Sequence, residues 1–332
     1  MATMRKRCLL DLLDGPEKPA FLDPCHRFHI GMKNLSSLDV CFDHKLGVCA
    51  SDYCPMVFFH TDQPFRFDRL LTHTTAATRC RFFPSGQLVV TTHKQNGEVR
   101  IWAPPNKACV QTLKGHTNTV TEVDFVDYGR NVLTASLDGL IKYWDCSVGK
   151  ETATVRPGAG RIWSVRTVSL PKRSNPGQLK ERLFIFGTGS DYLNAYDLSS
   201  GKQWFQYKCE GVPMCCEQLA DYQVLCATEL GLFYLIDLRM KRCINDKGTV
   251  TEEMSFPAKD GKQARPLALL RAHDGFYTAF SNGHVAFRSE LSESPDVWLM
   301  SSKDEVTDLS TDGPFVYSSS ADGFVRKYSV YH

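Results

Sequence analysis

The residues best suited to chemistry are a histidine, a serine and an aspartate near the middle of the chain, His116, Ser136 and Asp138. A hydroxyl, an imidazole and a carboxylate in contact can form the triad of a nucleophilic hydrolase. Here, however, the Ser-Leu-Asp-Gly turn lies between two short apolar runs, NVLTAS and LIKYW. That pattern predicts a β-hairpin, in which the three side chains would be buried beyond the reach of a substrate. We therefore interpret the group as structural.

Other candidate sites for catalysis or metal binding are weaker. Cys25, His26 and His29 are potential zinc ligands, but structural zinc sites usually draw a second ligand pair from elsewhere in the chain, and none matches. The stretch GTGS (187–190) lacks the third glycine of a dinucleotide-binding loop, and the chain contains neither GxxxxGK[ST] nor GxSxG. We expect a protein that is not an enzyme and that binds no cofactor and no metal.

The composition excludes several classes of partner. The 332 residues are 42% hydrophobic and 23% charged, with a net charge of +2, so no general attraction to nucleic acid or to a membrane is expected. No apolar run is long enough to span a bilayer, and Asp11 interrupts the apolar part of the N-terminal stretch, unlike a signal peptide. The thirteen cysteines are odd in number and include no CxxC pair, which indicates reduced thiols. A cytoplasmic location follows, with the nucleus as an alternative.

The elements that would position His116 and Asp138 belong to a repeat. Aligned on Trp144, which follows a tight turn by a few residues, the chain contains seven copies, at Phe58, Trp102, Trp144, Tyr196, Ile236, Arg288 and Tyr328. The steps between these positions are 44, 42, 52, 40, 52 and 40 residues. The two long steps contain polar insertions, at 171–182 and 244–263, and without them the period is about 42 residues. The cations of the first insertion fit a solvated loop better than a nucleic-acid contact, because no aromatic residues are interleaved with them.

Each copy predicts a four-stranded sheet, as in TEVDF, NVLTAS, LIKYW and ETATVR. Four-stranded units that recur every 40–45 residues and end in Trp-Asp are typical of propeller blades. The sequence therefore predicts an all-β, seven-bladed β-propeller as a single domain over residues 1–332, with the repeats in 30–332. Since the last copy has no room for a fourth strand, its sheet edge would be exposed. We expect the N-terminal segment, 1–29, to supply the closing strand from RKRCLLDLL or AFLDPCHRFHI.

Over residues 30–330 these patterns resemble the WD-repeat family. The resemblance implies that His116, Ser136, Asp138 and Trp144 form a hydrogen-bonded chain inside one blade, which satisfies the buried indole and imidazole groups. It also implies that exchange of a terminal strand closes the ring. The second copy has Thr72-His73 where Gly-His is expected, and the other copies also lack the complete set. We expect apolar packing to hold those blades together.

Propellers of this family usually bind partners through the loops that enter the first strand of a blade and the loops between its second and third strands. In this sequence those loops hold candidate contact residues, the acids Asp52, Asp191, Glu210, Glu229, Asp304, Glu305 and Asp322 with the aromatic anchors Trp163 and Tyr192. The cations of the same loops are Lys94, Arg156, Arg161, Arg265 and Lys303. We expect this face to be mainly acidic and to bind a basic protein surface. The alternative is that Asp and Glu are common here only because solvated turns favour them.

Four stretches carry a narrower resemblance, to the proteasomal ATPase-associated factor family. They are RCRFFPSGQLVVTT (79–92), KGHTNTVTEVDFVDYGRNVLTASLDGLIKYWDC (114–146), ATELGLFYLIDLR (227–239) and FVYSSSADGFVRKYSVYH (315–332). The resemblance implies an assembly chaperone of the base of the proteasome regulatory particle, which binds the carboxy-terminal domain of an ATPase subunit. Which subunit is bound is left open, as is any part played by the two insertions.

The alternative function is a WD-repeat scaffold or substrate receptor of another complex, such as a ubiquitin ligase or an RNA-processing assembly. A ligase receptor predicts a docking motif outside the propeller, and an RNA-processing role predicts a basic groove with aromatic residues. The sequence shows neither. Nothing in it indicates self-association, so we expect a monomer.

Overall fold

The computed structural model describes residues 20–53, 56–62, 67–69, 75–158, 160–170, 181–244, 264–272, 275–289, 297–299 and 302–329. Within these ranges the elements are β-strands, apart from one 3-10 turn at Asp127–Gly129. No helix in this part of the chain is long and apolar enough to cross a membrane. The fold is all-β, as the repeat predicts.

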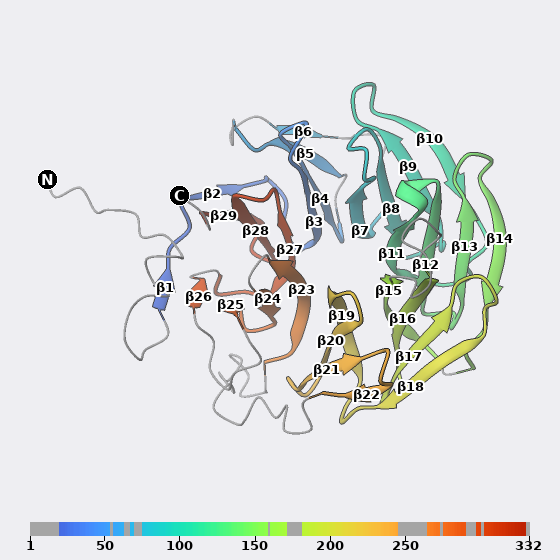
Figure 1. The fold of residues 1–332 in the computed structure, drawn as a ribbon. Helices are drawn as coiled ribbons and strands as arrows, with labels where there is room; N and C mark the ends of the chain where they lie inside the picture. Colours follow the sequence, from blue (N-terminus) through green and yellow to red (C-terminus); the bar gives the residue numbers. More distant parts are fainter. Residues whose placement is uncertain are drawn as a thin grey trace, which may run out of the picture. The chain divides into compact units, whose positions relative to one another are not determined.

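The described strands form seven sheets, which fall into two compact units (Figure 1). The middle unit, residues 75–249, contains four sheets of four strands each. Their strands are β7 (Ala77–Phe82), β8 (Val89–His93), β9 (Val99–Ala103) and β10 (Ala108–Leu113); β11 (Val120–Val126), β12 (Asn131–Ser136), β13 (Ile141–Asp145) and β14 (Lys150–Val155); β15 (Ile162–Leu170), β16 (Glu181–Thr188), β17 (Tyr192–Asp197) and β18 (Gln203–Lys208); and β19 (Pro213–Ala220), β20 (Gln223–Thr228), β21 (Phe233–Asp237) and β22 (Arg242–Cys243).

The terminal unit combines residues 1–74 with residues 250–332 and contains the other three sheets. Their strands are β3 (Leu35–Cys41), β4 (Leu46–Ser51), β5 (Val57–His60) and β6 (Phe67–Arg69); β23 (Pro266–Ala272), β24 (Gly275–Phe280), β25 (Val285–Arg288) and β26 (Val297–Leu299), joined by β1 (Ala20–Leu22); and β27 (Val306–Thr311), β28 (Phe315–Ser320) and β29 (Phe324–Ser329), joined by β2 (His26–His29). Seven consecutive blades make the fold a seven-bladed β-propeller.

The N-terminal segment closes the last blade, as predicted. Strand β2 pairs antiparallel with β29, and His26 lies opposite Lys327 in the register. Phe28 of β2 is buried and its ring lies 5.3 Å from that of Phe59 in the neighbouring sheet. A second contribution was not foreseen: β1 adds a fifth, parallel strand to β26. The N-terminal segment therefore completes one blade and extends another.

The repeat alignment is confirmed by the strands. The seven anchor positions fall in the third strand of their blades, namely Phe58 in β5, Trp102 in β9, Trp144 in β13, Tyr196 in β17, Ile236 in β21, Arg288 in β25 and Tyr328 in β29. All but Tyr196 are buried. The third strand is thus the element that the sequence identifies best, because it combines a preceding tight turn with a large inward side chain.

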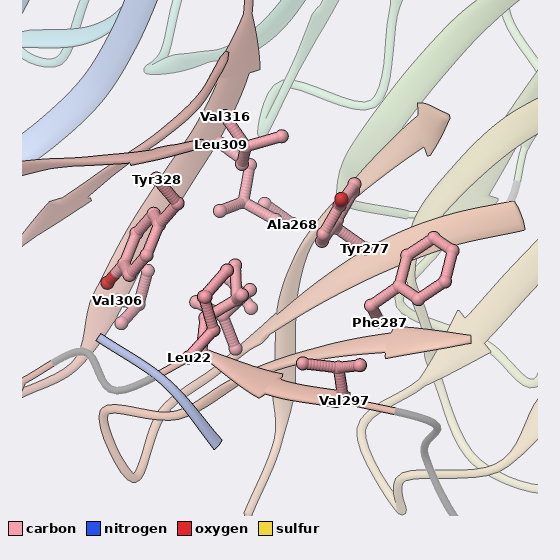
Figure 2. Packing of buried hydrophobic residues seen from close by; sticks show 12 residues of the cluster. Leu22, Ala268, Tyr277, Phe287, Val297, Val306, Leu309, Val316 and Tyr328 are labelled. Atoms are coloured by element: carbon pink, nitrogen blue, oxygen red, sulfur yellow. The ribbon is translucent and has the colours of Figure 1, made fainter. Parts of the chain in front are cut away.

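An apolar cluster joins two sheets of the terminal unit (Figure 2). Leu22 of β1 is 4% exposed and packs in the same cluster as Val297, which lies in the neighbouring strand β26. From the adjoining sheet, Val306 and Tyr328 enter the same core with no exposed surface. Burial of such side chains contributes about 1.5–3 kcal/mol each, so Leu22 helps to hold the short strand β1 in place.

Ion pairs link the first strands of successive blades in the middle unit. Arg79 on β7 and Arg166 on β15 both contact the Glu122 carboxylate of β11, at 3.2 and 3.3 Å. Arg166 also contacts Glu217 of β19 at 3.2 Å. Burial would raise the pKa of Glu122, but the guanidinium groups of Arg166, Arg79 and Arg81 outweigh it and lower that pKa to about 2. This four-strand charge ladder was not expected from the sequence.

Candidate protein-binding face

The polar chain of the third blade uses Thr134 where the sequence pointed to Ser136. The indole Nε1 of Trp144 donates to Thr134 Oγ1 at 2.8 Å, and the same hydroxyl lies 2.8 Å from His116 Nε2. His116 Nδ1 lies 2.8 Å from Asp138 Oδ2. Ser136 instead donates to the Asn118 carbonyl oxygen at 3.2 Å.

The strand register explains this correction. Trp144 lies opposite Val132, so Thr134 is two residues and Ser136 four residues along the neighbouring strand. At about 3.3 Å per residue these offsets are roughly 7 and 13 Å, and an indole ring reaches only the first. Ser136 stabilises the turn, since its hydroxyl accepts the Asp138 N–H at 3.1 Å.

The direction of each hydrogen bond follows from the groups present. A carboxylate only accepts, so His116 Nδ1 carries the proton that is donated to Asp138. Burial lowers the pKa of His116 below its usual value and outweighs the attraction of Asp138, so the ring is neutral at pH 7. Its Nε2 therefore accepts from the Thr134 hydroxyl, whose oxygen accepts from Trp144.

This order of hydroxyl, imidazole and carboxylate matches that of a hydrolase triad, but its burial prevents such chemistry. Thr134 has no exposed surface and His116 is only 5% exposed. The hydroxyl that would attack is enclosed between two sheets and has accepted an indole N–H. What the arrangement can do is fix the register of β11, β12 and β13.

The second blade contains a chain of its own. Trp102 Nε1 donates to Thr91 Oγ1 at 3.0 Å, and that hydroxyl lies 3.1 Å from His93 Nε2. His93 Nδ1 in turn lies 2.8 Å from Thr75 Oγ1. The expectation that apolar packing alone holds this blade is wrong, because β8 itself supplies the imidazole two residues after Thr91. His73, the expected counterpart of His116, lies outside the described residues.

Asp322, a predicted partner contact, is engaged within the last blade. Its carboxylate binds the guanidinium of Arg326 at 2.6 Å and accepts from the Ser302 hydroxyl at 2.8 Å and from Ser320. Burial raises the pKa of Asp322, but the hydrogen bonds of Arg326 and Ser320 outweigh it and lower that pKa to about 2. Asp322 therefore stabilises the β28–β29 turn and is a poor candidate for a partner contact.

The possible metal ligands near the N-terminus have other roles. Cys25 Sγ donates to the Lys327 carbonyl oxygen at 3.0 Å, and His29 Nδ1 accepts the Gly31 N–H at 3.0 Å. The His29 ring packs edge-on against Phe324, with 4.9 Å between centroids. Within the described ranges no group of three potential ligands is placed to hold a metal ion.

Five of the predicted contact residues lie at one end of two adjoining sheets in the middle unit. Backbone bonds connect their loops: Gly189 N to Arg161 O at 2.8 Å, Cys209 N to Asp191 O at 2.7 Å, and Glu229 N to Val212 O at 2.9 Å. Among the five, Asp191 and Glu210 are exposed, whereas Trp163, Tyr192 and Glu229 are half-buried.

Leu230 belongs to the same end, is 44% exposed, and approaches Gly211 so closely that a Cβ there would lie 2.8 Å from its Cγ. Sequence reasoning missed this leucine, because a single apolar residue in a turn gives no pattern. We call Trp163, Asp191, Tyr192, Glu210, Glu229 and Leu230 the loop face. Arg161 and Lys208, which are not part of this set, are also exposed at this end of the sheets. The three carboxylates of the loop face therefore exceed the neighbouring cations by one charge.

The terminal unit holds the remaining predicted acids. Asp304 and Glu305 are exposed just before β27, and Glu305 Oε1 lies 4.0 Å from Arg265 Nη2. Asp52 is half-buried directly after β4. Most of each insertion, 171–180 and 245–263, lies outside the described residues.

Two stretches of the chain match a known repeat family. Residues 107–145 and 298–329 match the family model described as "WD domain, G-beta repeat". At the level of fold, a chain from the structure titled "Crystal Structure of Mitotic Checkpoint Complex" superposes with a TM-score of 0.75 at 13% identity, over 96% of this chain and 98% of that one.

Curated relatives match over shorter stretches. They include Pre-mRNA-processing factor 17 of Homo sapiens, 26% identical over 39% of this chain and 21% of that protein. Eukaryotic translation initiation factor 3 subunit I of Danio rerio is 29% identical over 40% of this chain and 38% of that protein. The 26S proteasome regulatory subunit RPN14 of Saccharomyces cerevisiae is 39% identical over 26% of this chain and 21% of that protein. The matched part of the chain thus spans between a fifth and two fifths of these relatives.

Proposed function

We propose that the chain binds other proteins and has no enzymatic activity, because two of its stretches match the model of the WD-repeat family, whose propellers generally serve as non-catalytic scaffolds. More specifically, it acts as an assembly chaperone of the base of the 26S proteasome regulatory particle. Its partner there is the carboxy-terminal domain of an ATPase subunit, which it shields until the neighbouring subunit arrives. The protein acts as a monomer in the cytoplasm.

Two findings support the proteasomal partner. Among the relatives described above, the one with the highest identity carries the name of a proteasome regulatory subunit. Its match covers 90 residues, and the stretches that resemble the ATPase-associated factor family lie in the second, third, fifth and last blades. The observation that carries the binding role is the loop face, which combines the exposed carboxylates of Asp191 and Glu210 with the half-buried rings of Trp163 and Tyr192. Aromatic anchors with a charged rim are typical of protein interfaces.

The loop face suits a basic surface. Charge complementarity mainly accelerates association and makes it sensitive to salt, whereas Trp163, Tyr192 and Leu230 provide area that excludes water. Binding should therefore weaken with salt but not vanish, since the apolar contacts are not screened.

The test is a titration of the full chain against the isolated carboxy-terminal domain of each proteasomal ATPase subunit, at low and moderate salt. We expect one or two domains to bind, and Asp191→Lys with Glu210→Lys to raise the Kd by about tenfold or more. The matched control is Asp221→Lys, an exposed aspartate in the β19–β20 turn at the other end of the same sheet, which should leave the Kd unchanged. Failure of every domain to bind would refute the chaperone role. Binding that ignores both reversals would leave the role but exclude the loop face.

A second candidate is a scaffold or substrate-receptor role in another complex, which the splicing and translation names of the other relatives favour. An RNA-processing assembly or a ubiquitin ligase would then take the place of the proteasome. This role predicts that the tagged chain co-sediments with such a complex and not with proteasomal ATPases.

A further inference from the structure

A groove of about 310 Å³ lies between the third and fourth blades of the middle unit. Its buried floor is apolar and belongs to the cluster that joins these two blades, with Leu133, Ile141 and Phe184. The rings of Tyr143 and Tyr196 also line the groove and are half-buried. The volume lies near the lower limit of ligand pockets, about 300–1,000 Å³. The groove therefore fits one large apolar side chain better than a large ligand.

One wall of the groove is the outer edge of a sheet. Four consecutive residues, 153–156, line the groove from β14 and from the position directly after it. Gly201 of the β17–β18 turn approaches them, since a Cβ there would lie 3.5 Å from a methyl group of Val155. Among the described residues β14 pairs with β13 alone, so it is the outermost strand of its blade (Figure 1). The backbone N–H and C=O groups on the outer side of such a strand are a template for another chain.

The protein already adds an extra strand to an outer strand of this kind. In the sixth blade β1 pairs with β26 and places Leu22 in the apolar cluster there. Strand β14 has no such fifth strand in the described part of the chain. An extended segment that paired with β14 in the same way would direct alternate side chains toward the groove.

The groove has a net positive charge. Among the described residues that line it, Arg156 is the only charged one; its side chain is exposed and has no ion pair or hydrogen bond with this part of the chain. Three charged residues adjoin the lining residues in the sequence. Lys142 is paired with Glu151 at 2.5 Å, and Asp197 and Lys202 have opposite charges. One positive charge remains, so the groove favours an anionic group over a cationic one.

We propose that this groove binds an extended segment of a partner protein, which pairs with the outer edge of β14, buries one large apolar side chain between the blades and places a carboxylate against Arg156. Backbone pairing supplies affinity in such complexes, and side-chain pockets supply specificity. A protein segment is favoured over nucleic acid, because only a polypeptide has the N–H and C=O groups that complete a strand edge. The groove contains none of the loop-face residues, so the proposal does not depend on the ATPase partner.

The test uses a phage-displayed library of random 12-residue peptides, selected on the full chain and counter-selected on Ala153→Trp. Ala153 is exposed on β14 and lines the groove, so tryptophan there fills the groove without entering the core. We expect the retained peptides to contain a large apolar residue and at least one Asp or Glu. A synthetic copy should slow hydrogen exchange in β14, and Arg156→Glu should raise its Kd about tenfold or more. Both variants should keep the thermal midpoint of the wild type, which separates lost binding from lost folding.

The matched controls are Val110→Trp and Arg242→Glu. Val110 is 52% exposed on β10 and Arg242 is exposed on β22, so each control makes the same change on the outer strand of another blade and should leave the Kd unchanged. Three outcomes would overturn the proposal: no peptide survives the counter-selection, Arg156→Glu binds as tightly as the wild type, or the peptide slows exchange at the loop face and not in β14.

Discussion

Replacing Thr134 by valine tests the polar chain of the third blade with almost no change in shape. The substitution removes one hydroxyl and leaves two buried groups, His116 Nε2 and Trp144 Nε1, without their partner. A buried polar group that loses its partner costs about 1–3 kcal/mol. The two together predict a loss of about 2–6 kcal/mol in the free energy of unfolding.

Ser136→Ala is the matched comparison, because it also removes one hydroxyl from β12. Its bonds are to the Asn118 carbonyl oxygen and the Asp138 N–H, and these partners belong to an exposed and a half-buried residue rather than to buried rings. We expect a loss of only about 1 kcal/mol.

The measurement is urea unfolding followed by tryptophan fluorescence, with hydrogen exchange of β11 to β14 to locate the effect. Thr134→Val should accelerate exchange in these strands first. If Ser136→Ala were as destabilising as Thr134→Val, the register argument would be refuted, and Ser136 would hold the central position that the family resemblance implied.

Three further predictions concern other blades. The pKa of Glu122 falls from 4.5 to about 2 on folding, so the stabilisation that its carboxylate provides is complete above pH 4.5 and is lost as the pH falls toward 2. Glu122→Gln should remove about 3 kcal/mol of that pH dependence. Acid-unfolding curves of the variant and the wild type that ran parallel would contradict this. Phe28→Ala, which opens the contact with Phe59, should cost about 3–5 kcal/mol and release β29 first in hydrogen exchange, whereas uniform release would argue against strand closure. His93→Ala should destabilise the second blade by about 1–3 kcal/mol in urea unfolding, and an unchanged midpoint would show that its chain is dispensable.

The architecture was predictable because its signal is periodic. Seven positions separated by 40–52 residues each follow a tight turn, and the short alternating runs between them favour repeated small sheets over helical repeats. The closing strand was predictable for a related reason, since a blade without a fourth strand leaves an open edge. Strand β1 gave no such signal, because three residues carry too little pattern.

The details of the polar chains were less accessible. Thr134 and Ser136 have the same side-chain chemistry and the same strand face, and only the register with Trp144 distinguishes them. In the second blade the imidazole comes from β8, so a search for Gly-His upstream could not find it. The ladder of Arg79, Glu122 and Arg166 joins residues about 40 positions apart, and its members look like ordinary solvated charges until neighbouring strands bring them together.

The pairing of β2 with β29 also has a consequence for synthesis of the protein. His29 leaves the ribosome about 300 residues before Ser329, which at 5–20 residues per second is roughly 15–60 s. During that interval the middle unit can assemble from contiguous chain, whereas β1 and β2 have no partner strands to join. Their apolar residues, Leu22 and Phe28, stay available to general chaperones for that time. A pause late in translation would therefore affect the two blades that β1 and β2 join more than any blade of the middle unit.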